Sequence, residues 1–297
     1  MSKYDLNGDP TKAGPQPKFK PQTQDSPGEE YKMDPLPDYG LDSYKGTGKL
    51  QDKVAVITGG DSGIGRAVAL AYAREGATII ISYLNEHKDA QEIQKAVEEA
   101  GRECIIIPGD ISEETQCKYI IDTAVSKFKR IDILVNNAAY QGKQVEDIQE
   151  LDHKRVEYTF KTNIIAMFDL VRLAVPHIPK GGCIINVGSI QAYDPSAEIL
   201  DYATTKAAIV GFTKGLADKL LEKGIRVNCV APGPVWTPLV IASFPKEKNA
   251  SFGSNYPIKR PAQPRELAPA FVFLAAGTDS SYISGEILAV TGGKQTA

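Results

Sequence analysis

The sequence predicts an α/β fold in which helices cover both faces of one doubly wound parallel sheet of about seven strands, preceded by an extended arm. Three observations predict it. Short β-branched runs alternate with longer stretches of helical period, the runs are apolar throughout, and the composition changes abruptly near Leu50. The predicted strands are 54–58, 78–82, 104–107, 131–135, 183–187, 226–230 and 287–290, and the clearest helical stretches are 64–75, 90–100 and 115–127.

The first 49 residues differ from the rest of the chain. They hold seven of the 19 prolines and neither valine nor isoleucine, so they cannot bury enough apolar surface to fold alone. We therefore expect a Pro-rich arm at 1–49 and a folded domain at 50–297. Aromatic and aliphatic side chains at 31–49 indicate that this part of the arm docks on a folded surface. We expect the arm to add stability and contact area between subunits without touching the chemistry.

Charge and cysteine content exclude several classes of protein. The net charge of -3 gives no basic field for nucleic acid or an anionic membrane. No apolar run reaches the roughly 18 residues that a membrane-spanning helix needs, and the polar N-terminus lacks a signal-peptide pattern, which predicts a cytoplasmic protein. The four cysteines form no Cys-x-x-Cys pair and have no His cluster beside them. We expect free, buried thiols and no metal site.

A glycine-rich turn follows the first predicted strand and leads directly into a helix. It reads Thr58-Gly-Gly-Asp-Ser-Gly-Ile-Gly65. Gly59 permits the tight turn, Gly63 lets the backbone approach a pyrophosphate, and Gly65 lets the helix pack on the sheet. The helix start supplies N–H groups and the positive end of a dipole. Such a turn is common in loops, but between a first strand and a first helix it favours dinucleotide binding.

A tyrosine and a lysine open a long predicted helix. Tyr202 and Lys206 are four residues apart, so both side chains lie on one helix face. A nearby ammonium lowers the phenol pKa from about 10, so the pair can exchange a proton with an alcohol or carbonyl oxygen. Ser189 follows the strand 183–187, at the edge where sites of α/β proteins assemble. Each feature alone also has a structural interpretation, as a solvated helix pair or a turn serine.

Together these motifs resemble the short-chain dehydrogenase/reductase family. The glycine-rich turn, Asn136-Asn137-Ala138, Asn163, Ser189 and Tyr202-x-x-x-Lys206 stand in the order and spacing of that family. The segment 231–237 resembles its nicotinamide loop, and the whole resemblance covers roughly 50–293. Within that family, the residues at 59–65 and the Pro-rich arm resemble those of the branch that contains glucose/ribitol dehydrogenase-like proteins and aldehyde reductases. One departure is Ala139, where the family usually has glycine.

The resemblance implies a Rossmann-type, NAD(P)-binding catalytic domain at 50–297 that transfers a hydride. It implies that the Tyr202 phenol is the acid/base, that Lys206 lowers its pKa and binds the nicotinamide ribose, and that Ser189 holds the substrate oxygen. Asn163 would position a water that links Lys206 to solvent. The implied cofactor-binding residues are Gly59, Asp61, Ser62, Gly63, Ile64, Gly65, Tyr83, Asp110, Ile111, Asn137, Ala138, Tyr202, Lys206, Pro232, Gly233, Val235 and Thr237; no metal is implied.

The end of the second predicted strand bears on the choice between NAD and NADP. Tyr83 stands where NAD enzymes carry a carboxylate for the ribose 2′-OH, and no arginine follows. The missing carboxylate removes a repulsion against a 2′-phosphate, to which Ser82 or Ser62 can donate. Asp61 argues the other way. We expect a nicotinamide cofactor with a slight preference for NADP.

The substrate is expected to be a small aldehyde, ketone, sugar or polyol. This expectation follows from the family resemblance, and the mixture of aromatic and polar groups around the site suits anything from a sugar to an aromatic aldehyde. The Phe- and Pro-rich segment 243–262 is long enough to form a lid. The expected substrate pocket consists of Ile190, Gln191, Tyr193 and Trp236, together with Tyr140, Pro195 and the stretch 239–256.

Two alternative functions stay open at this stage. One is a 3-oxoacyl-thioester reductase, whose acidic carrier would meet Lys246, Lys248, Lys259 and Arg260. The other is a dinucleotide-sensing protein without catalysis, since a fold does not imply a function. The resemblance further implies a homotetramer that pairs through the helix of Tyr202 and the helix before it, 154–178.

Overall fold

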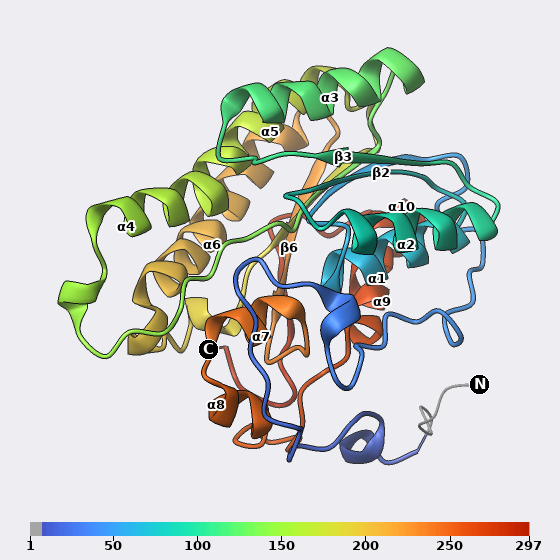
Figure 1. The fold of residues 1–297 in the computed structure, drawn as a ribbon. Coiled ribbons are helices and arrows are strands. Elements are labelled where there is room, and N and C mark those ends of the chain that lie inside the picture. Colours follow the sequence, from blue (N-terminus) through green and yellow to red (C-terminus); the bar gives the residue numbers. More distant parts are fainter. Residues whose placement is uncertain (1–7, 297) are drawn as a thin grey trace.

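The computed structural model describes residues 8–296, and in them a seven-stranded sheet has the order β3-β2-β1-β4-β5-β6-β7. Every neighbouring pair of strands is parallel (Figure 1). After β3 the chain crosses to the other side of β1, so a crevice opens at the carboxyl ends of β1 and β4. The strands are β1 (Val54–Thr58), β2 (Thr78–Tyr83), β3 (Cys104–Pro108), β4 (Ile133–Asn136), β5 (Cys183–Val187), β6 (Arg226–Pro232) and β7 (Ile287–Val290).

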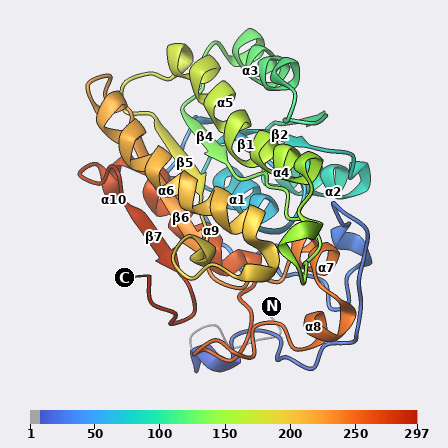
Figure 2. The same cartoon turned by 90° about the vertical axis from the view of Figure 1, so that its left-hand side faces the viewer.

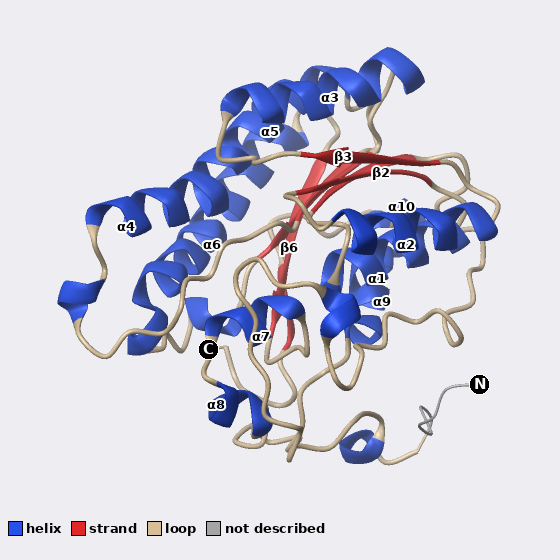
Figure 3. Cartoon of the chain, viewed as in Figure 1, coloured by secondary structure: helices blue, strands red, loops and turns tan. Residues whose placement is uncertain are grey.

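Helices cover both faces of this sheet (Figure 3). Successive strand residues point to opposite faces, so Ile57 joins the core under one helical layer and Val56 the core under the other. Burial on both faces explains why the strands are apolar throughout. One layer consists of α1 (Gly63–Arg74), α2 (His87–Glu99) and α9 (Pro264–Ala275). The other consists of α3 (Glu114–Phe128), α5 (Ala166–Ala174) and α6 (Leu200–Leu221), and α4 (His153–Phe160) lies beside α6. The remaining α-helices are short: α7 (Pro238–Ser243), α8 (Lys246–Ala250) and α10 (Gly277–Ser280).

The predicted fold class is confirmed, and the structure adds detail at the element ends. Hydrogen bonding extends β6 to Pro232, because β7 pairs with it as far as Val290. The helix expected at 154–178 is not continuous. It is divided into α4, a π-helical turn at Lys161–Ile165, and α5. A π-helical turn contains one residue more than an α-helical turn, and the hydrophobic pattern of a sequence does not reveal this single extra residue.

The N-terminal arm lies along its own domain and passes beside α8 and α7 (Figure 2). The N–H groups of Lys18 and Phe19 both donate to the Ala250 carbonyl oxygen at 2.9 Å. The Phe19 ring packs on the Trp236 ring, with centroids 4.2 Å apart, and the indole N–H donates to the Pro35 carbonyl oxygen at 2.9 Å. Docking therefore starts well before residue 31, where the sequence had placed its beginning.

The expectation of free, buried cysteines is confirmed for all four. Burial raises the pKa of the Cys104 and Cys117 thiols to about 12, so neither is a ready nucleophile. Among the helices of residues 8–296, none combines the length and the apolar character needed to cross a membrane.

Candidate active site

A cavity of about 500 Å³ lies at the carboxyl edge of the sheet, where the segments after β1, β4, β5 and β6 meet. These segments are far apart in the sequence, and the parallel sheet brings their ends to one edge. Almost all of the expected site residues line this cavity. They are Gly59, Asp61, Ser62, Gly63, Ile64, Tyr83, Asp110, Ile111, Asn137, Ala138, Ser189, Tyr202, Lys206, Pro232, Gly233, Val235 and Thr237.

The turn after β1 is fastened to the segment after β4. Asn137 Nδ2 donates to the carbonyl oxygens of Thr58 and Gly59, both at 2.9 Å. Gly59 has φ of +60°, a left-handed conformation that favours glycine. A Cβ at Gly65 would lie 2.0 Å from the Gly59 carbonyl oxygen, so only glycine lets α1 start this close to the turn. Gly65 thus packs beneath the turn and is not among the residues that line the cavity.

Acidic and hydroxyl side chains line the cavity at the end of β2. Asp61 and Glu86 are both buried there, and burial together with the charge of Glu86 raises the pKa of Asp61 to about 8. The Tyr83 hydroxyl is hydrogen-bonded to His87 Nδ1 of α2 at 3.0 Å. The Ser82 hydroxyl is buried and has no hydrogen-bond partner within residues 8–296. A protonated Asp61 and a free Ser82 donor are compatible with an anionic group at this end.

Ser189, Tyr202 and Lys206 converge from the end of β5 and from α6. The Tyr202 and Ser189 side chains line the same cavity, and Ser189 lies close enough to lower the Tyr202 pKa. Lys206 Nζ donates to the Val187 carbonyl oxygen at 2.8 Å and lies 5.2 Å from the centroid of the Tyr202 ring. Ser189 Oγ also accepts the Gln191 N–H at 3.1 Å, so it keeps the turn-capping role as well. The structure therefore brings together the three side chains that the sequence predicted would meet.

Burial controls the protonation of this group. It raises the pKa of Tyr202 above its ordinary range, and the nearby Ser189 side chain opposes this rise only in part. It also lowers the pKa of Lys206 to about 8. The rise in the Tyr202 pKa has a simple cause, because burial removes the water that would stabilise a charged phenolate. Tyr202 is protonated at neutral pH and is therefore in the form that donates a proton.

Asn163 lies in the π-helical turn and is fully buried. Its Oδ1 accepts the Tyr140 N–H at 2.7 Å, and its Nδ2 donates to the Tyr140 carbonyl oxygen at 2.9 Å and to Thr205 Oγ1 at 3.0 Å. These bonds tie the segment after β4 to α6, which carries Tyr202 and Lys206. Asn163 thus supports the site from behind, and its hydrogen bonds in the described structure lead to Tyr140 and Thr205, not to Lys206. π-Turns are frequent at functional sites because they re-aim a helix locally.

The structure corrects the substrate end of the expected site. Trp236 does not line the cavity, because its indole is fully buried under Phe19 and Pro35 of the arm. Tyr193, which is 38% exposed, also lies outside the lining, as does Pro195. The cavity is lined as expected by Tyr140, Ile190, Gln191 and, from the stretch 239–256, by Leu239, Val240, Phe244, Phe252 and Tyr256.

Sequence reasoning missed two lining residues of the arm, Ser26 and Pro27. Their presence corrects the expectation that the arm stays away from the chemistry. No local signal marks them, because Ser-Pro-Gly is typical of any turn. Only the path of the folded chain brings this turn to the cavity.

A doubly wound sheet with a glycine-rich turn and a Ser–Tyr–Lys group at its crevice defines the class of dinucleotide-dependent oxidoreductases. A family model described as enoyl-(acyl carrier protein) reductase matches residues 59–295. The NADPH-dependent aldehyde reductase 1, chloroplastic, of Arabidopsis thaliana is 49% identical over 273 residues, which cover 90% of this chain and 94% of that protein. The glucose and ribitol dehydrogenase of Daucus carota is 49% identical over 282 residues, which cover 93% of this chain and 96% of that protein.

Solved structures agree with these relatives. The L-sorbose reductase of Gluconobacter frateurii, complexed with NADPH and L-sorbose, superposes with a TM-score of 0.74 at 33% identity, covering 82% of this chain and 96% of that one. The chain belongs to the short-chain dehydrogenase/reductase family. It is an NAD(P)-dependent oxidoreductase that acts on small substrates. The alternative of a dinucleotide sensor without catalysis is therefore set aside.

Proposed function

We propose that this enzyme reduces a small aldehyde, ketone or sugar carbonyl, with Tyr202 as the general acid. The observation that carries the proposal is the convergence of Ser189, Tyr202 and Lys206 on one cavity, with Lys206 Nζ 5.2 Å from the centroid of the Tyr202 ring. Ser189 orients the carbonyl oxygen beside the phenol, and Tyr202 donates its proton to that oxygen. Lys206, with a pKa of about 8, is charged at neutral pH and stabilises the phenolate that remains. In the opposite direction the phenolate takes the alcohol proton.

The residues around the cavity fit a nicotinamide dinucleotide, which supplies or accepts the hydride when bound. Gly59, Gly63 and Ile64 line the cavity at the start of α1, where N–H groups without an intrahelical partner and the helix dipole favour a diphosphate. A Cβ at Gly63 would lie 2.9 Å from Thr237 Cγ2, so glycine keeps the space between the turn and the segment 232–237 open. This supports the turn at 59–65 and the segment 232–237 as the two sides that hold the cofactor.

The proposed preference is for NADP, by a small margin. Tyr83 leaves the end of β2 without the carboxylate typical of NAD enzymes, and the buried Ser82 hydroxyl is free to donate to a 2′-phosphate. Asp61 and Glu86 oppose a 2′-phosphate when ionised, but the raised pKa of Asp61 keeps that carboxyl largely neutral at pH 7. Three similar structures were solved with NADP or NADPH. Tyr83→Asp is expected to shift the preference toward NAD.

An acyl-carrier substrate is less well supported than a small carbonyl compound. The four basic residues near the lid were expected to meet an acidic carrier. Arg260 is instead buried and paired with Glu266 at 2.7 Å, and Lys248 is paired with Glu198. Lys246 lies 3.9 Å from Glu247. Three of the four charges are therefore already paired, while Lys259 is exposed. Paired charges offer little attraction to a further carboxylate or phosphate.

A panel of substrates tests the proposal. The full-length enzyme is assayed through nicotinamide absorbance with short aldehydes, sugars, polyols and a 3-oxoacyl thioester, each with both cofactors. The proposal expects turnover of aldehydes or sugars, and a ratio of kcat/KM between the cofactors of less than about a thousandfold, or about 4 kcal/mol. Turnover of the thioester alone, or a larger cofactor ratio, would contradict it.

We further propose that the enzyme is a homotetramer in a reducing, cytoplasmic compartment. Four free thiols are typical of such a compartment. The proposed pairing surface is the outer face of α5 and α6, where Ile165 and Phe168 are 48% and 56% exposed. Small exposed residues of α6, such as Ala207, Ala208 and Gly211, allow a second helix to approach closely. No metal is needed for the proposed chemistry, because Tyr202 supplies the proton; activity is expected to survive exhaustive chelation.

A further inference from the structure

We propose that the arm loop 24–29, through Ser26 and Pro27, forms part of the wall of the cofactor cavity, and that Glu30 is a positioning residue that holds the phosphate-binding turn in place for the dinucleotide. The inference rests on the assignment of the cavity to NAD(P). It goes beyond that assignment because it gives the arm, which lies outside the Rossmann-type domain, a part in cofactor binding.

The arm approaches the cavity through a closed loop. Gln24 fastens both ends of this loop: its Nε2 donates to the Glu29 carbonyl oxygen at 3.1 Å, and its Oε1 accepts the Glu29 N–H at 2.8 Å. Ser26 and Pro27, between these ends, line the cavity. The loop is therefore shaped by its own hydrogen bonds before any cofactor is present, as a binding wall requires.

The same loop packs closely against the start of α7. Gly28 has φ of +84°, and a Cβ there would lie 2.9 Å from the Pro238 carbonyl oxygen. The backbone thus reaches Pro238 at a distance that only glycine allows. Pro238 follows Thr237, one of the expected cofactor-binding residues. The arm loop therefore contacts the side of the cavity that is formed by the segment 232–237.

Glu30 connects this loop to the opposite side, the phosphate-binding turn. Its carboxylate is almost fully buried and accepts the Gly63 N–H at 2.6 Å. The second carboxylate oxygen lies 3.0 Å from Arg66 Nη1. The Glu30 N–H donates to Asp89 Oδ2 at 2.6 Å, and Asp89 also pairs with Arg66 at 3.2 Å. A buried ion-pair network of this kind is sensitive to the loss of one member.

The position of Glu30 leaves the cavity free for the cofactor. Gly63 and Ile64 line the cavity, whereas Glu30 does not. Glu30 therefore accepts the Gly63 N–H, one of the N–H groups at the start of α1, from outside the cavity. By the geometry of a helix start, the N–H of Ile64 also lacks an intrahelical partner, and it stays available for a phosphate oxygen. Arg66, held by Glu30, also donates from Nε to the Asp61 carbonyl oxygen at 2.7 Å, which fixes the turn itself.

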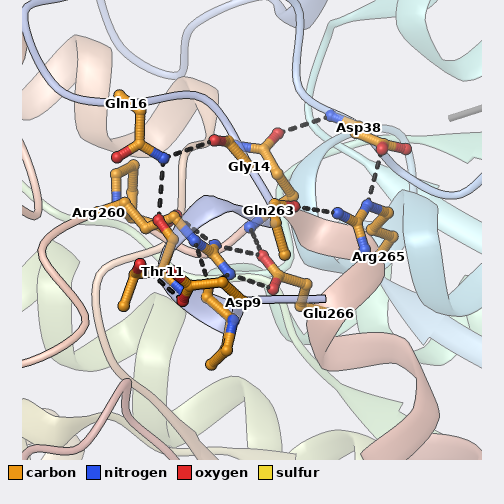
Figure 4. Close-up of polar contacts among 12 residues, drawn as sticks. Asp9, Thr11, Gly14, Gln16, Asp38, Arg260, Gln263, Arg265 and Glu266 are labelled. Carbon is orange, nitrogen blue, oxygen red and sulfur yellow. Dashed lines mark hydrogen bonds and ion pairs between the residues drawn. The ribbon is translucent and has the colours of Figure 1, made fainter. Parts of the chain in front are cut away.

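A second anchor of the arm provides a matched control. Asp38 pairs with Arg265 Nε at 2.7 Å and accepts the Arg265 N–H at its carbonyl oxygen at 3.0 Å (Figure 4). This contact fastens the arm to α9, and the contact of Glu30 fastens it to α1. Neither Asp38 nor Arg265 lines the cavity. Removing the Asp38 side chain therefore loosens the arm without touching the phosphate-binding turn.

The experiment compares Glu30→Ala, Glu30→Gln and Asp38→Ala in the full-length protein. NADPH and NADH are titrated by nicotinamide fluorescence without substrate, and melting temperature and steady-state kinetics are measured beside it. We expect Glu30→Ala to raise the cofactor Kd and KM by about tenfold or more, with a smaller change in kcat, since a charge-assisted hydrogen bond is lost. Glu30→Gln keeps an acceptor for Gly63 and should show a smaller rise, of about threefold.

Asp38→Ala should lower the melting temperature but leave the Kd unchanged. An unchanged or lowered Kd in Glu30→Ala, or the same rise in Asp38→Ala, overturns the inference. If Glu30→Ala does not fold, the cofactor Kd of Glu30→Gln is compared with that of Asp38→Ala instead, and an equal Kd in the two variants overturns the inference. Failure of the proposed function is distinguishable, because the wild-type protein would then bind neither NADPH nor NADH.

Discussion

Tyr202 illustrates how one residue depends on its immediate surroundings. It is 8% exposed, lines the cavity together with Ser189 and lies beside the ammonium of Lys206. Burial favours the neutral phenol and also disfavours the charge of Lys206. The group is therefore better prepared to donate a proton to a carbonyl than to remove one from an alcohol at neutral pH.

Tyr202→Phe is expected to lower kcat by about 10²–10⁴-fold, the usual value of general acid–base catalysis. The cofactor Kd should stay close to the wild-type value, because the ring is kept and only the transferable proton is lost. Steady-state kinetics and a fluorescence titration measure the two quantities. Tyr193→Phe removes a hydroxyl just outside the cavity and serves as the control. Retention of more than about a tenth of kcat by Tyr202→Phe would remove this residue as the acid.

The pKa shifts predict different pH profiles for the two directions of the reaction. The Tyr202 pKa is raised, so the protonated form needed for reduction is present throughout the neutral range. The phenolate needed for alcohol oxidation grows about tenfold per pH unit below that pKa. Oxidation should therefore accelerate from about pH 6 upward, and the rise should weaken above about pH 8, where Lys206 loses its charge. Parallel profiles of kcat for reduction and oxidation would contradict this assignment.

At the scale of elements, the site is built from pieces that support one another. The π-helical turn aims Asn163 at Tyr140 and Thr205, and this links the segment after β4 to α6. The short α7 lines the cavity with Val240, and Phe244, directly after α7, lines it too. Phe19 of the arm packs with Trp236 and with Ile241 of α7. The lid expected at 243–262 is thus held on its outer side by a separate part of the chain.

Phe19→Ala is expected to loosen the arm over the lid. Truncating a buried phenylalanine costs about 3–5 kcal/mol in a core, and here the cost is limited by the free energy of docking the arm. The arm should be cleaved faster in limited proteolysis, followed by mass spectrometry, while the domain from residue 50 onward stays intact. Leu36→Ala, at a 60% exposed position of the same arm, is the control. Equal cleavage rates in the two variants would show that Phe19 does not fasten the arm.

At the scale of the whole molecule, the outer face of α5 and α6 is the surface that the proposed assembly uses. Phe168 stacks on Phe212 at 4.5 Å between centroids, and both belong to this face. A Cβ at Gly211 or Gly215 would meet no atom within 4 Å, so this stripe of α6 is open in the protomer. Small residues on an open helix face allow close packing against a symmetry-related helix.

Gly215→Arg should break the assembly without unfolding the protomer. The arginine has room in the protomer but would collide with a helix packed on α6. Light scattering at micromolar concentration should show a tetramer for the wild-type protein and a smaller species for the variant, with the circular dichroism spectrum preserved. Ser126→Arg, on the exposed side of α3, should stay tetrameric. A monomeric wild-type protein would overturn the assembly proposal.

The sequence alone predicted the class of fold and most of the cavity lining. The apolar runs, the glycine-rich turn and the spacing of Ser189, Tyr202 and Lys206 depend on local geometry, which a sequence displays directly. Strand ends of a parallel sheet necessarily meet at one edge, so residues after strands could be assigned to a common site without coordinates.

Only the tertiary structure decided where the arm goes. Trp236 was expected in the cavity and lies under Phe19, while Pro27 and Glu30 were assigned to a peripheral arm and reach the cavity wall and the phosphate-binding turn. An arm without helical or strand period has no local pattern that fixes its path. Its path depends on contacts with residues up to hundreds of positions away, and the protonation of Tyr202 likewise depends on burial, which no local pattern determines.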